Sequence, residues 1–186
     1  MKNVVLMGFM GTGKTHVGEL LADRFNYTFI DINRQIEEAL DMSMIQIFKT
    51  FSEDQVLELE QAAINDVQMN RNLIIALPYN AVDNENCIRI LKYNSFFIWL
   101  KSSFGYLMKN IVKDEDENRV IRPVLSHYSK SNNFIKCKKG AVTQRLLTDY
   151  DLKYNIVADY IFDIVDKEPT LVFNQLSHYL QKNLIV

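Results

Sequence analysis

Residues Gly8 to Thr15 read GFMGTGKT and fit the phosphate-binding pattern G-x-x-x-x-G-K-[ST] at every defined position. The motif follows the apolar run Val4–Met7 and precedes a helical pattern, which is the strand–loop–helix context that such a loop needs. Glycines let backbone N–H groups turn inward around a phosphate, and the N-terminus of the following helix adds partial positive charge. An accidental glycine-rich turn would have to reproduce this whole context by chance. The motif therefore predicts a nucleotide-binding protein.

Individual residues of the motif have expected roles at a nucleotide. Lys14 supplies a full charge near the outer phosphates, and Thr15 offers its hydroxyl to Mg²⁺. His16 follows directly and is included as a neighbour of the nucleotide, although a partly exposed residue in the first helical turn is the simpler interpretation. The expected nucleotide-binding residues are Gly8, Gly11, Thr12, Gly13, Lys14, Thr15 and His16.

Length and composition indicate one globular domain, which we expect to span residues 1–186, with 48% hydrophobic and 24% charged residues. The net charge of −2 gives no general attraction to nucleic acid or anionic membranes, so neither is an expected partner. The uncharged stretch Asn3–Gly13 is too short to cross a bilayer, and we expect a cytoplasmic protein. Cys87 and Cys137 lack His or Cys at metal-ligand spacing, which favours two reduced thiols.

Short apolar runs alternate with helical patterns along the chain. This alternation predicts an α/β fold, with a five-stranded parallel sheet covered by helices on both faces. The expected strands are Val4–Met7, Tyr27–Asp31, Leu73–Leu77, Ser95–Leu100 and Tyr160–Ile164. The expected helices are Lys14–Phe25, Asp54–Met69, Asp83–Tyr93, Phe104–Val112, Thr143–Lys153 and Thr170–Leu184.

The segment Lys113–Lys139 departs from this alternation, because it is charged, rich in Ser and Asn, and contains the pair Arg122-Pro123. A solvated connection is one interpretation of such a segment. The other is a lid that closes over a bound nucleotide, which the phosphate-binding loop makes useful. We therefore predict a lid at about residues 113–139.

Further motifs occur in a recognisable order. The loop is followed by Phe29-Ile30-Asp31-Ile32-Asn33, Ile36-Glu37-Glu38 and Ile45-x-Ile47-Phe48, and later by Ile74-Ile75-Ala76, Arg122-Pro123 and Tyr154-x-x-x-Ala158. Their order and spacing resemble the shikimate kinase family over almost the whole chain. The resemblance implies a three-layer α/β/α P-loop fold of the nucleoside-monophosphate-kinase type. It also implies Mg²⁺-dependent transfer of the γ-phosphoryl group of ATP to a hydroxyl of shikimate, leaving ADP.

The resemblance assigns roles on the nucleotide side. Asp31 matches the first aspartate of the family's D-x-D motif, so Thr15 and Asp31 are the expected metal-binding residues. Arg122 matches the lid arginine, and the expected catalytic residues are Lys14, Asp31 and Arg122. Two plainer interpretations remain, a turn residue at the end of a strand for Asp31 and a solvated charge for Arg122. The arginine that stacks on adenine falls near Lys109 or Asn110, neither of which stacks as a guanidinium does.

The positions that the resemblance assigns to the substrate differ from the family's residues. Asn33 stands for the second aspartate, Leu57 and Tyr150 for two carboxylate-binding arginines, and Pro78, Tyr79 and Asn80 for three glycines. An asparagine takes up no proton at neutral pH, a proline has no N–H to donate, and a tyrosine adds a large ring. Glu60 keeps the family's residue. These differences predict a degenerate substrate pocket.

We therefore predict a divergent member of the family that binds ATP or ADP with Mg²⁺ but phosphorylates shikimate weakly or not at all. A working kinase for another acceptor, or for shikimate through relocated Arg34 or Arg145, is one alternative. A nucleotide-binding interaction module without chemistry is the other.

Overall fold

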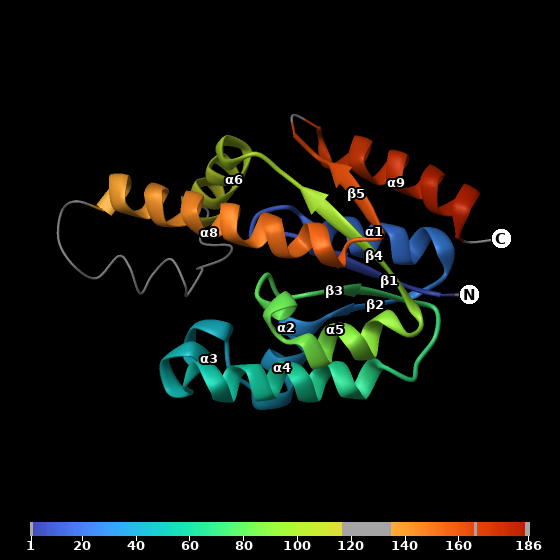
Figure 1. Cartoon of the computed structure of the whole chain (residues 1–186), viewed down its shortest axis with the longest axis horizontal. Helices are drawn as coiled ribbons and strands as arrows, with labels where there is room; N and C mark the ends of the chain where they lie inside the picture. The colour runs from blue at the N-terminus through green and yellow to red at the C-terminus, as the bar shows by residue number, and fades with distance from the viewer. Residues whose placement is uncertain (1, 117–134, 166, 185–186) are drawn as a thin grey trace.

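A computed structural model describes residues 2–116, 135–165 and 167–184. Its centre is a five-stranded, fully parallel sheet with strand order β2-β3-β1-β4-β5 (Figure 1). The strands are β1 (Asn3–Met7), β2 (Thr28–Asp31), β3 (Leu73–Ala76), β4 (Ser95–Lys101) and β5 (Tyr160–Asp163). Each of the five predicted strands is confirmed to within one residue at either end.

The strands are buried on both faces of the sheet. In β1, Val4 and Leu6 pack into one core, whereas Val5 and Met7 pack into a second core on the opposite face. Successive side chains of a strand point to opposite faces, so both sets are fully buried only when helices cover both sides. This two-sided burial explains why the strands are continuous apolar runs in the sequence.

The helices form the two outer layers. On one face, α1 (Lys14–Phe25) and α9 (Pro169–Asn183) contribute Val17, Leu21 and Leu176 to the core. The helices whose buried residues join the other core are α2 (Ile32–Leu40), α3 (Met44–Thr50), α4 (Glu53–Val67), α5 (Glu85–Lys92), α6 (Phe104–Asp116) and α8 (Ile135–Val157). The predicted three-layer α/β/α architecture is therefore confirmed.

Two short helices, α2 and α3, were not predicted as helices. Asp31 caps α2, and Ser43 and Gln46 form a capping box at the start of α3. The S-x-x-Q pattern at 43–46 is a helix-start signal that the sequence did contain. The predicted helix Thr143–Lys153 is also too short, because α8 spans Ile135–Val157. A helical pattern interrupted by Gly140 and Thr143 explains the late predicted start.

The predicted lid, residues 113–139, lies largely outside the described residues. At its two ends the chain is helical, since α6 continues to Asp116 and α8 begins at Ile135. Arg122 and Pro123 fall between these helices and are not described. Within the described ranges, no helix combines the length and apolar character needed to cross a membrane.

Candidate nucleotide and acceptor site

The candidate site lies at the carboxyl edge of the sheet, where the loops after β1, β2 and β3 meet. A cavity of about 1420 Å³ runs along this edge. Ligands of open parallel sheets bind at this edge, where neighbouring strands connect in opposite directions. In Figure 1, α3 and α4 lie at the bottom of the view, and α6 and α9 lie at the top. The residues that line the cavity come partly from α2, α3, α4 and the loop after β3, and partly from α6 and residues 164–172, so the cavity has two ends.

The loop after β1 has the backbone conformation that its glycines allow. Gly8 has φ of 149°, and a Cβ on it would lie 2.7 Å from the carbonyl oxygen of Leu100. Gly13 has φ of 79° and caps α1 in the left-handed region. Both conformations are strained for residues with a side chain. The loop therefore passes close beneath β4 and presents the N-terminus of α1 to the cavity.

Polar contacts hold this loop in place. The Lys14 Nζ donates hydrogen bonds to the Gly8 carbonyl at 2.7 Å and to the Phe9 carbonyl at 3.1 Å. The buried Thr12 hydroxyl donates to the same Phe9 carbonyl at 2.9 Å. From α6, Asn110 Nδ2 donates to the Gly11 carbonyl at 3.0 Å. Of the predicted nucleotide-binding residues, all except Gly8 line the cavity.

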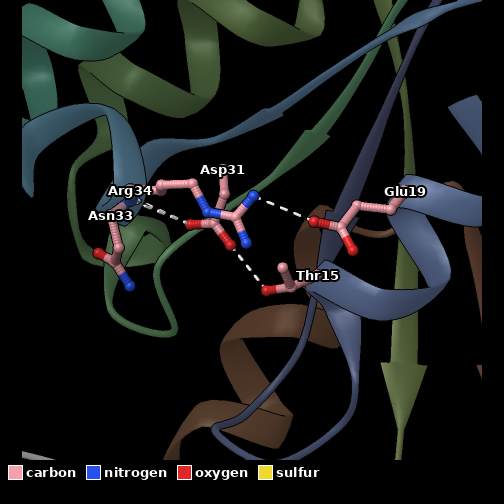
Figure 2. A network of polar contacts seen from close by, with 5 residues as sticks. All are labelled: Thr15, Glu19, Asp31, Asn33 and Arg34. Atoms are coloured by element: carbon pink, nitrogen blue, oxygen red, sulfur yellow. Dashed lines mark hydrogen bonds and ion pairs between the residues drawn. The ribbon is translucent and has the colours of Figure 1, made fainter. Parts of the chain in front are cut away.

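Thr15 and Asp31 form the candidate metal site. The Thr15 hydroxyl donates to Asp31 Oδ2 at 2.7 Å, and Figure 2 shows the two side chains pointing toward each other. The other carboxylate oxygen of Asp31 accepts the backbone N–H groups of Asn33 and Arg34 at 3.1 and 3.4 Å. A hydroxyl and a carboxylate are hard oxygen ligands of the kind that Mg²⁺ takes alongside phosphate oxygens. The described residues hold no cluster of three or more His, Cys, Asp or Glu that could bind a metal ion by themselves.

Asn33 and Arg34 follow Asp31 at the start of α2. In Figure 2 the Asn33 side chain extends to the side of Asp31 opposite Thr15, and Arg34 reaches across to α1. There the Arg34 guanidinium forms an exposed ion pair with Glu19 at 3.0 Å. Both Asn33 and Arg34 line the cavity. We call the region beside them the acceptor end, because the resemblance places the acceptor there. Its side chains include Asn33, Arg34, Ile45, Phe48, Glu60, Pro78, Tyr79 and Asn80.

Two tyrosines of α8 hold the loop after β3 in place. The Tyr154 hydroxyl, which is fully buried, donates to the Tyr79 carbonyl at 2.7 Å. The Tyr79 ring packs edge-on against Tyr150, with ring centroids 5.1 Å apart, and against Phe9 at 5.5 Å. Pro78, Tyr79 and Asn80, which the resemblance assigns to the substrate, all line the cavity. The proline and the tyrosine ring thus form a fixed wall of the acceptor end.

Two predicted pocket residues do not line the cavity. Tyr150 packs behind Tyr79, and its hydroxyl donates to Asp83 Oδ2 at 2.6 Å. Burial raises the pKa of Tyr150, and the hydrogen bond to Asp83 raises it further. Leu57, on the half-buried side of α4, is absent from the lining as well. The cavity lining therefore does not include these two residues, and Tyr150 is held behind the lining by its contacts with Tyr79 and Asp83.

Glu60 is a site residue whose environment the sequence did not reveal. It projects from α4, is 1% exposed, and lines the acceptor end. Asn80 Nδ2 donates to its Oε2 at 3.4 Å, whereas its Oε1 is buried without a hydrogen-bond partner among the described residues. Burial raises the pKa of Glu60 to about 7. The Asn80 hydrogen bond lowers it, and the nearby Asp83 charge raises it.

Cationic side chains are unevenly distributed along the cavity. Lys14 lies in the central loop, and Lys109 and Lys167 lie at the far end, beside α6 and the β5–α9 connection. Within the part of the chain that the structure describes, Arg34 is the one Lys or Arg at the acceptor end, and it pairs with Glu19. Arg145 is exposed on α8 and does not line the cavity.

Comparisons with known proteins agree with this geometry. A sequence model described as shikimate kinase matches residues 10–181. The shikimate kinase of Caldanaerobacter subterraneus subsp. tengcongensis is 34% identical over 167 residues, which cover 90% of this chain and 89% of that protein. The shikimate kinase of Thermoanaerobacter pseudethanolicus is 32% identical over 166 residues, covering 89% and 88%.

Solved structures show the same fold. The shikimate kinase from Acinetobacter baumannii in complex with shikimate superimposes with a TM-score of 0.81 at 23% identity, covering 99% of this chain and 96% of that one. The shikimate kinase from Bacteroides thetaiotaomicron gives 0.82 at 21% identity, with coverage of 100% and 99%. The phosphate-binding loop, the strand order and the similarity along nearly the full length lead to one conclusion: the chain belongs to the shikimate kinase family.

Proposed function

We propose that this protein binds ATP or ADP with Mg²⁺ and transfers phosphoryl groups to shikimate weakly or not at all. The family's activity is phosphoryl transfer from ATP to shikimate. The observation that carries the proposal is the contrast between the two parts of the cavity. The loop, Lys14, Thr15 and Asp31 bring together groups that suit a phosphate and Mg²⁺, while Arg34 is the one described cation at the acceptor end and forms an ion pair with Glu19.

On the nucleotide side, the chain's own groups suit the developing charge of phosphoryl transfer. The start of α1 and Lys14 line the cavity, where backbone N–H groups and the Lys14 ammonium would meet the outer phosphates. Thr15 and Asp31 would hold Mg²⁺, which when bound neutralises charge on the phosphate oxygens. Arg122 of the lid is proposed to contact the same phosphates. These groups position and stabilise charge, which is most of what this reaction requires.

On the acceptor side, the shortage of cationic side chains determines how far the affinity for shikimate falls. A hydrogen bond to a charged group contributes about 1.5–3 kcal/mol, so two missing arginine contacts to a carboxylate remove about 3–6 kcal/mol. This corresponds to about 10²–10⁴ in affinity. The family's carboxylate at position 33 would accept the proton of the reacting hydroxyl if it acts as general base. Asn33 cannot do so, which would lower the rate of phosphoryl transfer by about 10²–10⁴. Neighbouring effects in one pocket do not simply add.

The test is an ADP-release assay with ATP, Mg²⁺ and shikimate, alongside calorimetric titration of ADP. We expect ADP to bind, and turnover to stay below about 1 s⁻¹, the lower end for kinases. Lys14→Ala should abolish ADP binding, whereas Lys49→Ala, on the exposed side of α3, should leave it unchanged. Turnover of shikimate at or above about 1 s⁻¹ would refute the acceptor part of the proposal. Absence of ADP binding would refute the nucleotide part.

A second candidate is a working kinase for a different acceptor. It is favoured by the cavity itself, which continues past Asp31 to the acceptor end rather than being closed by Pro78 and Tyr79. A panel of hydroxylated compounds in the same ADP-release assay tests it. Stimulated ADP release with any member supports it, and no stimulation by any member, with ADP binding intact, contradicts it.

A further inference from the structure

The acceptor end contains a buried carboxyl group with one unused oxygen. Glu60 is 1% exposed and lines the cavity, and its Oε1 has no hydrogen-bond partner among the described residues. Its other oxygen receives only a long hydrogen bond, 3.4 Å, from Asn80. None of the ion pairs found between described residues involves Glu60. A buried polar atom without a hydrogen-bond partner destabilises the folded protein. A ligand group that donates a hydrogen bond to Glu60 Oε1 would supply the missing partner, and this contact would strengthen binding.

The groups that surround Glu60 are acidic or neutral. They come from three elements packed around it: Asp83 from the 3₁₀ helix Ala81–Asp83, which forms an ion pair with Lys153, Cys87 from α5 and Tyr150 from α8. Glu37 of α2 also lines the cavity and accepts the Met44 N–H at 2.7 Å. Burial, together with the nearby Asp83 charge, raises the pKa of Glu60 to about 7. An added carboxylate beside Glu60 would repel its ionised form, whereas an uncharged hydroxyl would not.

Apart from Arg34, which forms an ion pair with Glu19, the remaining side chains of the acceptor end suit an uncharged ring compound. Ile45, Phe48 and Tyr79 offer apolar surface, and the Asn33 and Asn80 amides offer neutral hydrogen-bonding groups. Carbon-ring faces pack on such walls while hydroxyls reach the amides and Glu60.

We infer that the acceptor end takes an uncharged cyclic polyol, that a ligand hydroxyl donates a hydrogen bond to Glu60 Oε1, and that Glu60 selects against a carboxylate. The inference rests on the proposed function, because it names the ligand class of the same cavity. Glu60 is a specificity residue in this account. It accepts a hydrogen bond from a ligand hydroxyl and repels a ligand carboxylate, and it takes no part in phosphoryl transfer.

The probes are shikimate and its carboxamide, which has the same ring and hydroxyls but no charge. Both are titrated by calorimetry into the full chain saturated with ADP and Mg²⁺, at pH 6 and pH 8. We expect the carboxamide to bind about tenfold or more tightly than shikimate at pH 8, because like charges repel strongly in a poorly solvated site. Shikimate should bind more weakly at pH 8 than at pH 6, since Glu60 ionises in this interval, and the carboxamide should not.

Glu60→Gln keeps the shape and the carbonyl acceptor, so it should retain carboxamide binding and remove the pH dependence of shikimate binding. Glu58→Gln, on the exposed face of the same helix, is the matched control and should change neither. Shikimate binding as tightly as the carboxamide at pH 8, an unchanged pH trend in Glu60→Gln, or no carboxamide binding would each overturn the inference. The proposed function is judged separately, by ADP binding and shikimate turnover of the unmodified protein.

Discussion

Asp31 supports both the fold and the expected Mg²⁺ site, and two substitutions separate these roles. One of its oxygens caps α2 through Asn33 N and Arg34 N, and the other accepts the Thr15 hydroxyl at 2.7 Å. Asp31→Ala removes a cap, about 1 kcal/mol, and a partly buried hydrogen bond, about another 1 kcal/mol. For a chain of this size, about 2 kcal/mol lowers Tm by about 4–8 °C.

Asp31→Asn keeps both contacts, because the amide oxygen caps α2 and the amide NH₂ donates to the Thr15 hydroxyl. Its stability should stay within about 0.5 kcal/mol of the unmodified protein. It lacks the negative charge, so the gain in ADP affinity on adding Mg²⁺ should fall by about tenfold or more, about 1.4 kcal/mol.

Thermal unfolding without nucleotide measures the first effect, and calorimetric titration of ADP with and without Mg²⁺ measures the second. The reasoning fails if Asp31→Asn is as unstable as Asp31→Ala. It also fails if Asp31→Asn keeps the full Mg²⁺ dependence of ADP binding.

Three further predictions concern the glycine loop, the Tyr79 wall and Glu60. Gly8→Ala places a Cβ 2.7 Å from the Leu100 carbonyl oxygen and should lower stability by about 1–3 kcal/mol in thermal unfolding, whereas Gly105→Ala, with open space at its Cβ, should not destabilise. Tyr154→Phe leaves the Tyr79 carbonyl without its buried donor and should cost about 1–2 kcal/mol in urea unfolding; an unchanged midpoint would contradict this contact. The pKa of Glu60 is raised from 4.5 to about 7, so the folded state binds the proton more tightly and stability falls as pH rises through this interval, by roughly 3 kcal/mol in all. Glu60→Gln should flatten that part of the pH–stability curve, and an identical curve in the variant would count against the buried carboxyl.

The strands and the phosphate-binding loop were predictable because their signals are local. A strand buried on both faces is a short apolar run, and the loop is an eight-residue pattern with fixed spacing. The helices α2 and α3 were missed because each is short and begins at a cap rather than with a long periodic pattern.

The residues assigned to the substrate that do line the cavity, Asn33 and Pro78 to Asn80, lie shortly after the ends of strands. Pro78, Tyr79 and Asn80 line the cavity because the carboxyl end of β3 places them there. Tyr150 does not line the cavity because its ring packs against Tyr79 and its hydroxyl donates to Asp83, contacts between segments that are distant in the sequence. Glu60 gave no local signal, because its burial depends on residues from α5, α8 and the loop after β3, all distant in sequence.

We propose that the phosphate-binding groups are intact while the described part of the acceptor end lacks the charge to hold a carboxylate. Titrating shikimate into the full chain saturated with ADP and Mg²⁺ tests this claim directly. We predict a dissociation constant of about 1 mM or weaker, at or beyond the upper end of ordinary enzyme–substrate affinities. A dissociation constant in the micromolar range would contradict the account, because it would require cationic contacts to the carboxylate that the described acceptor end does not offer.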